Sequence, residues 1–195
     1  MAGDVDNRLN RYYGSETQGW ESFRTTDRRL DTPSIRGKML IGVVSDTHGY
    51  LNPKVPELLK GVDHILHAGD IGDDAIIAQL SSIAPITVVR GNNDREGPTS
   101  DYPLVATVVL GGSRILLTHE VKVPKGFDDP VLRGYRQAEV DAVVYGHSHI
   151  AHQERRGPVF FFNPGAAGKR RFKVVPSIGF LVVEPGWIEG SIAPL

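Results

Sequence analysis

Residues 39–48 read MLIGVVSDTH, an apolar run of strand length that ends in Asp46 and His48. Four later apolar runs also end in side chains of types that bind metals. They are ILHAGD (65–70) with Asp70, TVVRGNND (87–94) with Asn92, ILLTH (115–119) with His119, and VVYGHSH (143–149) with His147 and His149. In open α/β sheets, ligands bind beyond the carboxyl ends of the strands. If these strands are parallel neighbours, the polar side chains converge at one edge of a sheet.

The rest of the pattern predicts an α/β fold whose second half is mostly β. We expect strands at residues 39–45, 64–67, 86–90, 104–110, 114–118, 142–145, 151–155, 159–163, 178–183 and 187–192. The fourth and fifth of these form a hairpin around Gly111-Gly112. We expect helices at residues 53–59, 73–82 and 130–140, with Asn52 as the N-cap of the first. The fold class that follows is a two-sheet β-sandwich flanked by helices.

The composition is that of an ordinary globular domain. The chain has 195 residues, 40% of them hydrophobic and 23% charged, which is enough for one domain with a real core. A net charge of −1 gives no electrostatic case for nucleic-acid or anionic-membrane binding, and no apolar run is long enough to span a bilayer. The absence of cysteine excludes disulfides, thiolate metal sites and a cysteine nucleophile. It also fits a reducing compartment, so we expect a cytoplasmic protein.

Residues 1–38 differ from the remainder of the chain. They are polar and charge-mixed, and neither a helical nor a strand period persists in them. We interpret them as an N-terminal extension that precedes a domain at residues 39–195. Three interpretations stay open: a flexible tail, a docking arm that uses its aromatic residues, or a natural start at Met39. The aromatic residues are Tyr12, Tyr13, Trp20 and Phe23.

Each polar motif has an ordinary structural explanation when it is taken alone. An aspartate after a strand is often a helix cap, and an asparagine after glycine is often a turn residue. A lone histidine is more often a satisfied core or surface residue than a ligand. The chain has seven histidines, however, and four of them follow these strands, which argues against chance placement of the whole set.

The residue types suit a pair of divalent metal ions. Imidazole and carboxylate groups bind Mn, Fe, Zn or Ni rather than soft metals. Asp70 lies between the two halves of the set and can bridge two ions through its oxygens. Ions about 3.5–4 Å apart hold the attacking and leaving oxygens of a phosphoryl group, and they make hydroxide available near neutral pH. No protein nucleophile is then needed.

The ordered motifs resemble those of the calcineurin-like metallophosphoesterases. They read Asp46-Thr47-His48, Gly69-Asp70, Gly91-Asn92-Asn93-Asp94, His119 and Gly146-His147-Ser148-His149. Asn163-Pro164-Gly165 is similar to the small YfcE-like phosphodiesterase branch, and the resemblance covers residues 39–195. It implies two β-sheets flanked by helices and two divalent ions, Mn first, with Ni, Zn or Fe as alternatives. It also implies that Asp46, His48 and His149 bind one ion, that Asn92, His119 and His147 bind the other, and that Asp70 bridges them.

Three positions depart from the common family pattern. Many members have a proton-donating histidine where this chain has Asn93, and the small phosphodiesterase branch also commonly lacks that histidine. Glu120 follows His119 where a glycine is common, so a negative charge is gained. The loop at residues 166–171 carries Lys169 and Arg170, which either bind substrate phosphate or form an ordinary solvated basic loop.

The sequence thus predicts a phosphoesterase in which a metal-bridging hydroxide attacks a small phosphodiester. Asp70, Asn92 and Asp94 are assigned catalytic roles, with Asp94 orienting a ligand, and Asn93, Lys169 and Arg170 are assigned to substrate binding. A phosphomonoesterase or nuclease of the same family is the first alternative, and a non-catalytic retromer-type scaffold is the second. We expect neither a membrane partner nor a clear nucleic-acid surface.

Overall fold

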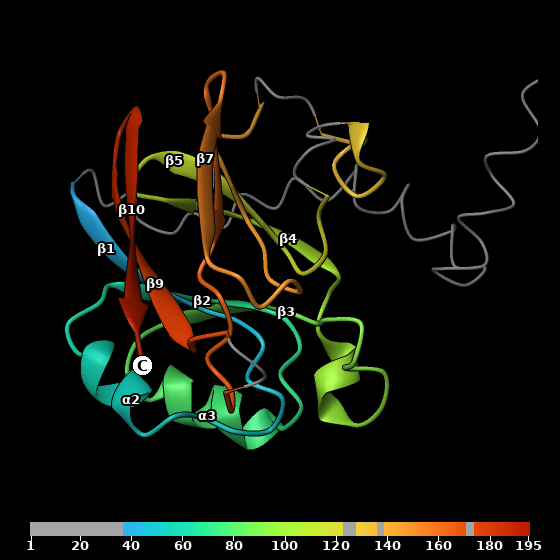
Figure 1. Cartoon of the computed structure of the whole chain (residues 1–195). Helices are drawn as coiled ribbons and strands as arrows, with labels where there is room; N and C mark the ends of the chain where they lie inside the picture. The colour runs from blue at the N-terminus through green and yellow to red at the C-terminus, as the bar shows by residue number, and fades with distance from the viewer. Residues whose placement is uncertain (1–36, 123–127, 136–138, 171–173) are drawn as a thin grey trace, which may run out of the picture. The chain divides into compact units, whose positions relative to one another are not determined.

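A computed structural model of the chain describes residues 37–122, 128–135, 139–170 and 174–195, and these form two five-stranded sheets (Figure 1). In spatial order the first sheet contains β10 (Trp187–Pro194), β9 (Ser177–Glu184), β1 (Met39–Val44), β2 (His64–Ala68) and β3 (Ile86–Val89). The second contains β4 (Val105–Leu110), β5 (Ser113–Thr118), β6 (Ala142–Val144), β8 (Val159–Asn163) and β7 (His152–Arg156). The predicted two-sheet α/β fold is therefore confirmed.

Each sheet contains three parallel strands and two antiparallel ones. In the first sheet β1, β2 and β3 are parallel, while β9 and β10 are antiparallel to their neighbours. In the second, β5, β6 and β8 are parallel, while β4 and β7 are antiparallel. Parallel neighbours end at the same edge of a sheet, so the segments that follow β1, β2 and β3, and those that follow β5 and β6, are brought together.

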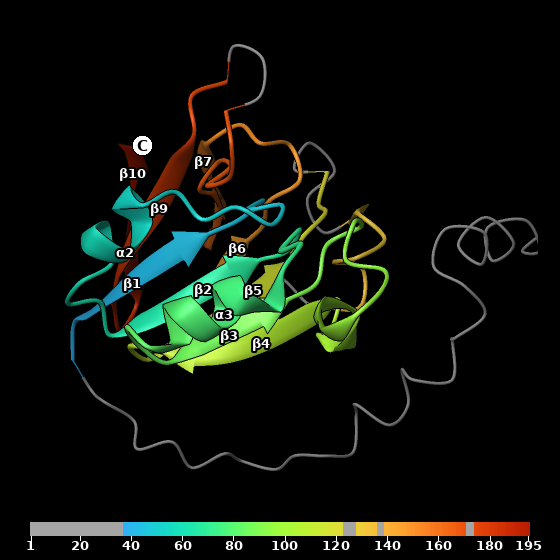
Figure 2. The same cartoon turned by 90° about the horizontal axis from the view of Figure 1, so that it is seen from below.

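The central strands are buried on both faces, which explains their continuous apolar runs. One core lies between the sheets and joins Ile41 and Leu66 of the first to Leu117 and Phe162 of the second. Alternate residues of β1 and β2 face a second core, which α2 (Lys54–Leu58) and α3 (Asp74–Ser81) cover on one side of the first sheet (Figure 2). A third core lies on the outer face of the second sheet, where Leu132 packs against Val143 and Phe161.

The helix predicted at residues 130–140 is wrong for its described part. Residues 130–135 form turns instead. The Asp129 carboxylate accepts hydrogen bonds from the backbone N–H groups of Lys122 and Val131, and its backbone oxygen accepts from Leu132 and Arg133. This local arrangement ties the segment to the end of β5 and places Leu132 in the third core, while Gly134 is a poor residue for helix propagation.

Two further predictions concern the hairpin around Gly111-Gly112 and the N-terminal extension. The hairpin is confirmed, since β4 and β5 pair around Gly111 and Gly112, which both have positive φ. Residues 1–36 lie outside the described residues, so the interpretation of the N-terminal extension stays a prediction. Among the residues described, no helix has the length and apolar character that a membrane crossing requires.

Candidate metal centre

Seven side chains reach one site from the carboxyl ends of five strands. Each follows a strand of the parallel sets: Asp46 and His48 after β1, Asp70 after β2, Asn92 after β3, His119 after β5, and His147 and His149 after β6. The structure brings all seven predicted ligands together. They form two groups of facing donor atoms, one around Asp46 and one around Asn92, and Asp70 lies between them.

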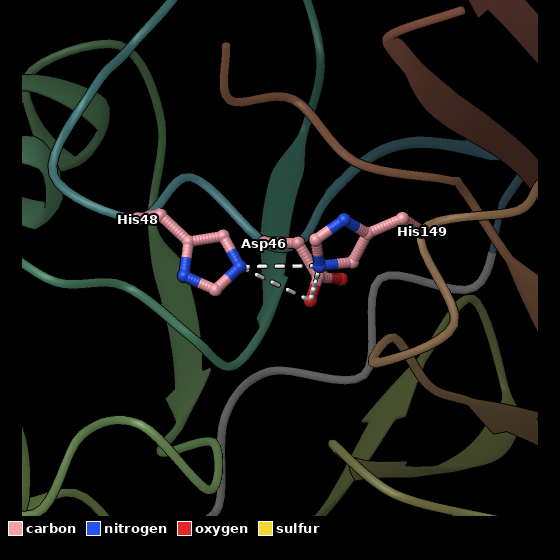
Figure 3. Close-up of side chains that lie close together, drawn as sticks. All are labelled: Asp46, His48 and His149. Carbon is pink, nitrogen blue, oxygen red and sulfur yellow. Dashed lines mark hydrogen bonds and ion pairs between the residues drawn. The ribbon is translucent and has the colours of Figure 1, made fainter. Parts of the chain in front are cut away.

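The first group consists of Asp46, His48 and His149 (Figure 3). His149 Nε2 lies 3.2 Å from Asp46 Oδ1 and 3.1 Å from His48 Nε2, and His48 Nε2 lies 3.9 Å from Asp46 Oδ1. Asp46 is fully buried, and within the described residues its Oδ1 has no hydrogen-bond partner. A buried carboxylate oxygen without a donor is costly. A cation among these three atoms would satisfy it, so the residues fit a metal ion.

The second group consists of Asp70, Asn92, His119 and His147. His119 Nδ1 lies 2.8 Å from the Ala68 backbone oxygen, so Nδ1–H donates there and Nε2 carries the lone pair in the neutral ring. His119 Nε2 lies 3.1 Å from Asn92 Oδ1. Asn92 Oδ1 is also an acceptor, and it lies 2.9 Å from His147 Nδ1. Several acceptors facing one another also fit a cation.

Asp70 connects the two groups. Its Oδ2 lies 3.4 Å from His119 Nε2 and 3.7 Å from His48 Nε2. Burial raises the pKa of Asp70, but the contacts with His119 and Asn93 outweigh burial and hold this pKa well below its usual value. For His119, burial lowers the pKa, but the contacts with Asp70 and Asp46 outweigh burial and raise this pKa above its usual value. The carboxylate is therefore held in its charged, ligand-competent form.

Asp46 lies close to ligands of both donor groups, whereas the resemblance implied only one. Donor atoms of Asp46, Asp70 and His119 also lie within 4.8 Å of one another, so Asp46 takes part in a second cluster besides its own. The implied assignment gave Asp46 to a single ion. In the structure two carboxylates, rather than one, lie between the histidines of the two groups.

The backbone at these ligands is unusual. Among the described non-glycine residues, positive φ occurs at Asp46 (54°), His48 (47°), Asp70 (53°), His147 (68°) and His149 (60°). The left-handed region costs an L-residue on the order of 1 kcal/mol or more, and such strain collects at functional sites. Every one of these residues belongs to the predicted ligand set, so the turns aim side chains at the centre at the expense of local stability.

Asp94 supports the loops rather than a ligand side chain. Its carboxylate accepts hydrogen bonds from the backbone N–H groups of Ile71, Gly72 and Gly91, at 2.8–3.0 Å. It therefore ties the turn after β2 to the turn after β3. The two turns approach so closely that a Cβ at Gly91 would collide with the Asp70 carboxylate, which explains the glycine before Asn92.

Asn163 is a supporting residue whose role sequence reasoning missed. Its Nδ2 donates to the Gly146 backbone oxygen at 2.7 Å and to Ser148 Oγ at 3.2 Å, and its Oδ1 accepts from the Gly165 N–H. Asn163 thus holds the Gly-His-Ser-His turn at the end of β6. The only signal for it was the similarity of Asn163-Pro164-Gly165 to one family branch.

Ser45 and the buried contact between Thr47 and His67 support the strand ends that carry Asp46 and Asp70. Ser45 Oγ lies 2.6 Å from Asp46 Oδ2. His67 Nε2 lies 3.1 Å from Thr47 Oγ1, whose hydroxyl donates to the Ile71 backbone oxygen. Complete burial lowers the pKa of His67 to about 4, so the ring is neutral. The only sequence signals were that Thr47 lies within the Asp46-Thr47-His48 motif and that His67 shortly precedes Gly69-Asp70.

Of the predicted substrate residues, Asn93 contacts the ligand Asp70, while Lys169 and Arg170 lie in an exposed loop that follows Gly168. Asn93 binds Asp70 twice, through its backbone N–H to Oδ1 at 2.9 Å and through Nδ2 to Oδ2 at 2.6 Å. Lys169 and Arg170 are exposed, and Lys169 Nζ lies 5.4 Å from the centre of the Tyr50 ring, two residues beyond His48. The Gly168 N–H donates to the Asp46 backbone oxygen at 3.2 Å. The basic loop is therefore anchored to the turn that carries the first group.

The family profile of the calcineurin-like phosphoesterase superfamily domain matches residues 39–186, which contain all seven ligands. The chain belongs to this superfamily. A probable metallophosphoesterase of Methanothermobacter thermautotrophicus is 33% identical over 161 residues, which are 79% of this chain and 91% of that protein. The phosphodiesterase YfcE of Escherichia coli K12 is 30% identical over 170 residues, 79% of this chain and 77% of the relative.

A solved structure of Vps29 from Chaetomium thermophilum is similar in fold to this chain. It matches with a TM-score of 0.63 and 25% identity, and the match covers 80% of this chain and 97% of Vps29. The family, the donor groups and the curated relatives support a metal-binding hydrolase of phosphoric esters at the level of the superfamily.

Proposed function

We propose that the chain is a phosphodiesterase that works with two divalent metal ions. The observation that carries this proposal is the pair of donor groups that share Asp70, each with histidine nitrogens and carboxylate or amide oxygens facing one another. Asp46, His48 and His149 would hold one ion, and Asn92, His119 and His147 would hold the other. Mn²⁺ is the first candidate because the resemblance to the YfcE-like branch implies it, while the nitrogen and oxygen ligands themselves suit Ni, Zn and Fe equally.

The ions would supply a nucleophile of lowered pKa and neutralise charge on the phosphoryl oxygens. Side chains of the protein would hold the ligands of these ions in position. His119 keeps one tautomer through Ala68, and Asn93 holds both oxygens of Asp70 in place. Asn93 cannot act as a general acid, because an amide does not donate its proton to a leaving oxygen. The site is therefore suited to esters whose leaving group departs without protonation.

A small phosphodiester is the substrate that we propose, and Lys169 with Arg170 would contact its phosphate. A phosphomonoesterase or a nuclease of the same family is the alternative among enzymes. The structural likeness to Vps29 fits the non-catalytic alternative. The complete set of seven ligand side chains favours the enzyme, since a scaffold has no need of five strained ligand residues.

The test is a panel of esters offered to the full chain after loading with Mn²⁺, Ni²⁺, Zn²⁺ or Fe²⁺. The panel contains aryl monoesters, aryl and alkyl diesters, cyclic nucleotides and short DNA. We expect the highest kcat/KM with an aryl diester in the presence of Mn²⁺. Metal binding without turnover of any ester would support the scaffold, and faster turnover of monoesters or DNA would support the other enzymes.

A further inference from the structure

Glu120 lies on the open side of the second donor group. It directly follows His119, and its Oε1 lies 4.0 Å from His147 Nε2. The side chains of His147 and Glu120 are 44% and 35% exposed. The imidazole of His147 therefore has Asn92 at its Nδ1 and Glu120 at its Nε2. Glu120 is thus a partly exposed carboxylate beside the second donor group.

His147 does not neutralise this carboxylate when it serves as a metal ligand. Imidazole binds metals in its neutral form, whereas a glutamate at the protein surface is negatively charged at neutral pH. Glu120 thus adds a negative charge beside a group that already contains Asp70. The addition is unfavourable for any substrate that brings a further negative charge to this side.

The two classes of phosphate ester differ in this respect. A phosphomonoester has a second ionisation near pH 6 and is mostly a dianion at pH 7, whereas a phosphodiester is a monoanion. The extra anionic oxygen of the monoester would lie close to Glu120 if it occupied the second group. Charge interactions between half-exposed groups change an equilibrium constant by up to about fivefold.

We propose that Glu120 is a specificity-determining residue that disfavours dianionic phosphomonoesters relative to monoanionic phosphodiesters. This inference rests on the proposed function and adds to it a reason, within this chain, for selecting diesters. It does not require Glu120 to take part in the chemical step.

The first experiment compares Glu120→Gln with the full chain loaded with Mn²⁺. The measured quantity is the ratio of kcat/KM for p-nitrophenyl phosphate to that for bis(p-nitrophenyl) phosphate. We expect the ratio to rise by up to about fivefold in Glu120→Gln, and the rise to shrink at 1 M salt, where the Debye length falls to about 3 Å. Glu120→Asp keeps the charge and should stay near the original ratio. Glu189→Gln removes an exposed carboxylate on β10 and should leave the ratio unchanged.

A binding measurement separates failure of this inference from failure of the proposed function. Calorimetry on the same Mn²⁺-loaded proteins gives Kd for inorganic phosphate and for dimethyl phosphate. Glu120→Gln should lower the Kd for inorganic phosphate by up to about fivefold more than the Kd for dimethyl phosphate. This difference is expected even if neither ester is hydrolysed. Absence of hydrolysis would contradict the proposed function alone. Equal changes for both ligands, or an unchanged ratio in both experiments, would overturn the role of Glu120.

Discussion

At the scale of single residues, Asp70 is the side chain on which both donor groups depend. Its Oδ2 faces His119 on one side and His48 on the other, whereas each histidine belongs to one group. We expect Asp70→Asn to lower kcat at least ~100-fold, at the upper end of what changes around a metal site cost. Asp101→Asn, at an exposed carboxylate in the 3-10 helix Pro98–Asp101, is the matched control. Near-normal turnover of Asp70→Asn with both metals bound would contradict the bridging role.

For Asn93, the proposed function predicts how the rate depends on the leaving group. A positioned general acid contributes about 10²–10⁴-fold, and Asn93 supplies none. We expect aryl diesters to be hydrolysed far faster than alkyl diesters, and Asn93→His to raise alkyl turnover most. Asn93→Ala removes the same bond to Asp70 without adding an acid, so a rise shared by both variants would not come from proton donation. A flat dependence on leaving-group pKa in the unmodified protein would show that another acid is present.

His67 gives the fold a pH dependence of defined sign. Burial lowers its pKa to about 4 in the folded chain, against about 6.5 when it is unfolded. The unfolded chain therefore binds more protons between these values, so His67 contributes stability above pH 6.5 that is lost as the pH falls toward 4. The expected slope is at most about 1.4 kcal/mol per pH unit.

Denaturant unfolding of metal-free protein measures this effect, with His67→Gln as the comparison. Metal must be absent from both proteins, because protonation of the ligands adds its own pH dependence. The difference in unfolding free energy between the two proteins should change between pH 6.5 and 4. A constant difference over that range would mean that His67 is charged or accessible in the folded chain.

At the scale of elements, the turn after β6 depends on Asn163 at the end of β8. Its amide satisfies the Gly146 backbone oxygen and reaches Ser148, so Asn163→Ala leaves both without this donor. We expect metal affinity to fall about 10–100-fold and the metal-free protein to lose about 1–3 kcal/mol of stability. Metal titration and denaturant unfolding measure the two effects separately. Unchanged affinity would show that the turn keeps its shape unaided.

The strands were easier to predict from the sequence than the turns and the supporting contacts. The five strands that carry ligands were predictable because their residues are largely buried, so their apolar runs are nearly continuous and the polar residues that end them stand out. The turns at residues 130–135 were not predictable, because the spacing of apolar residues in this segment fits a helix. The turns depend on hydrogen bonds to the Asp129 carboxylate, which the sequence does not reveal. Asp94, Asn163 and Ser45 act through contacts between distant segments, which no local spacing encodes.

At the scale of the whole molecule, the domain at residues 39–195 should carry the chemistry by itself. Every ligand lies after Met39, and the family match begins there. We expect a chain that begins at Met39 to keep its metal affinity and its turnover of an aryl diester within about twofold. Circular dichroism and metal titration check that it folds. A folded, metal-loaded chain without turnover would place part of the site in residues 1–38.

The central claim is that two divalent ions, held by the seven ligands, make the chain a phosphodiesterase. The most direct measurement is a titration of metal-free protein with Mn²⁺ in which bound ions and turnover of bis(p-nitrophenyl) phosphate are followed together. We predict no turnover before metal is added and a maximum at about two ions per chain, since both groups must be filled. Full turnover in protein that elemental analysis shows to be metal-free, or a maximum at one ion per chain, would contradict the claim.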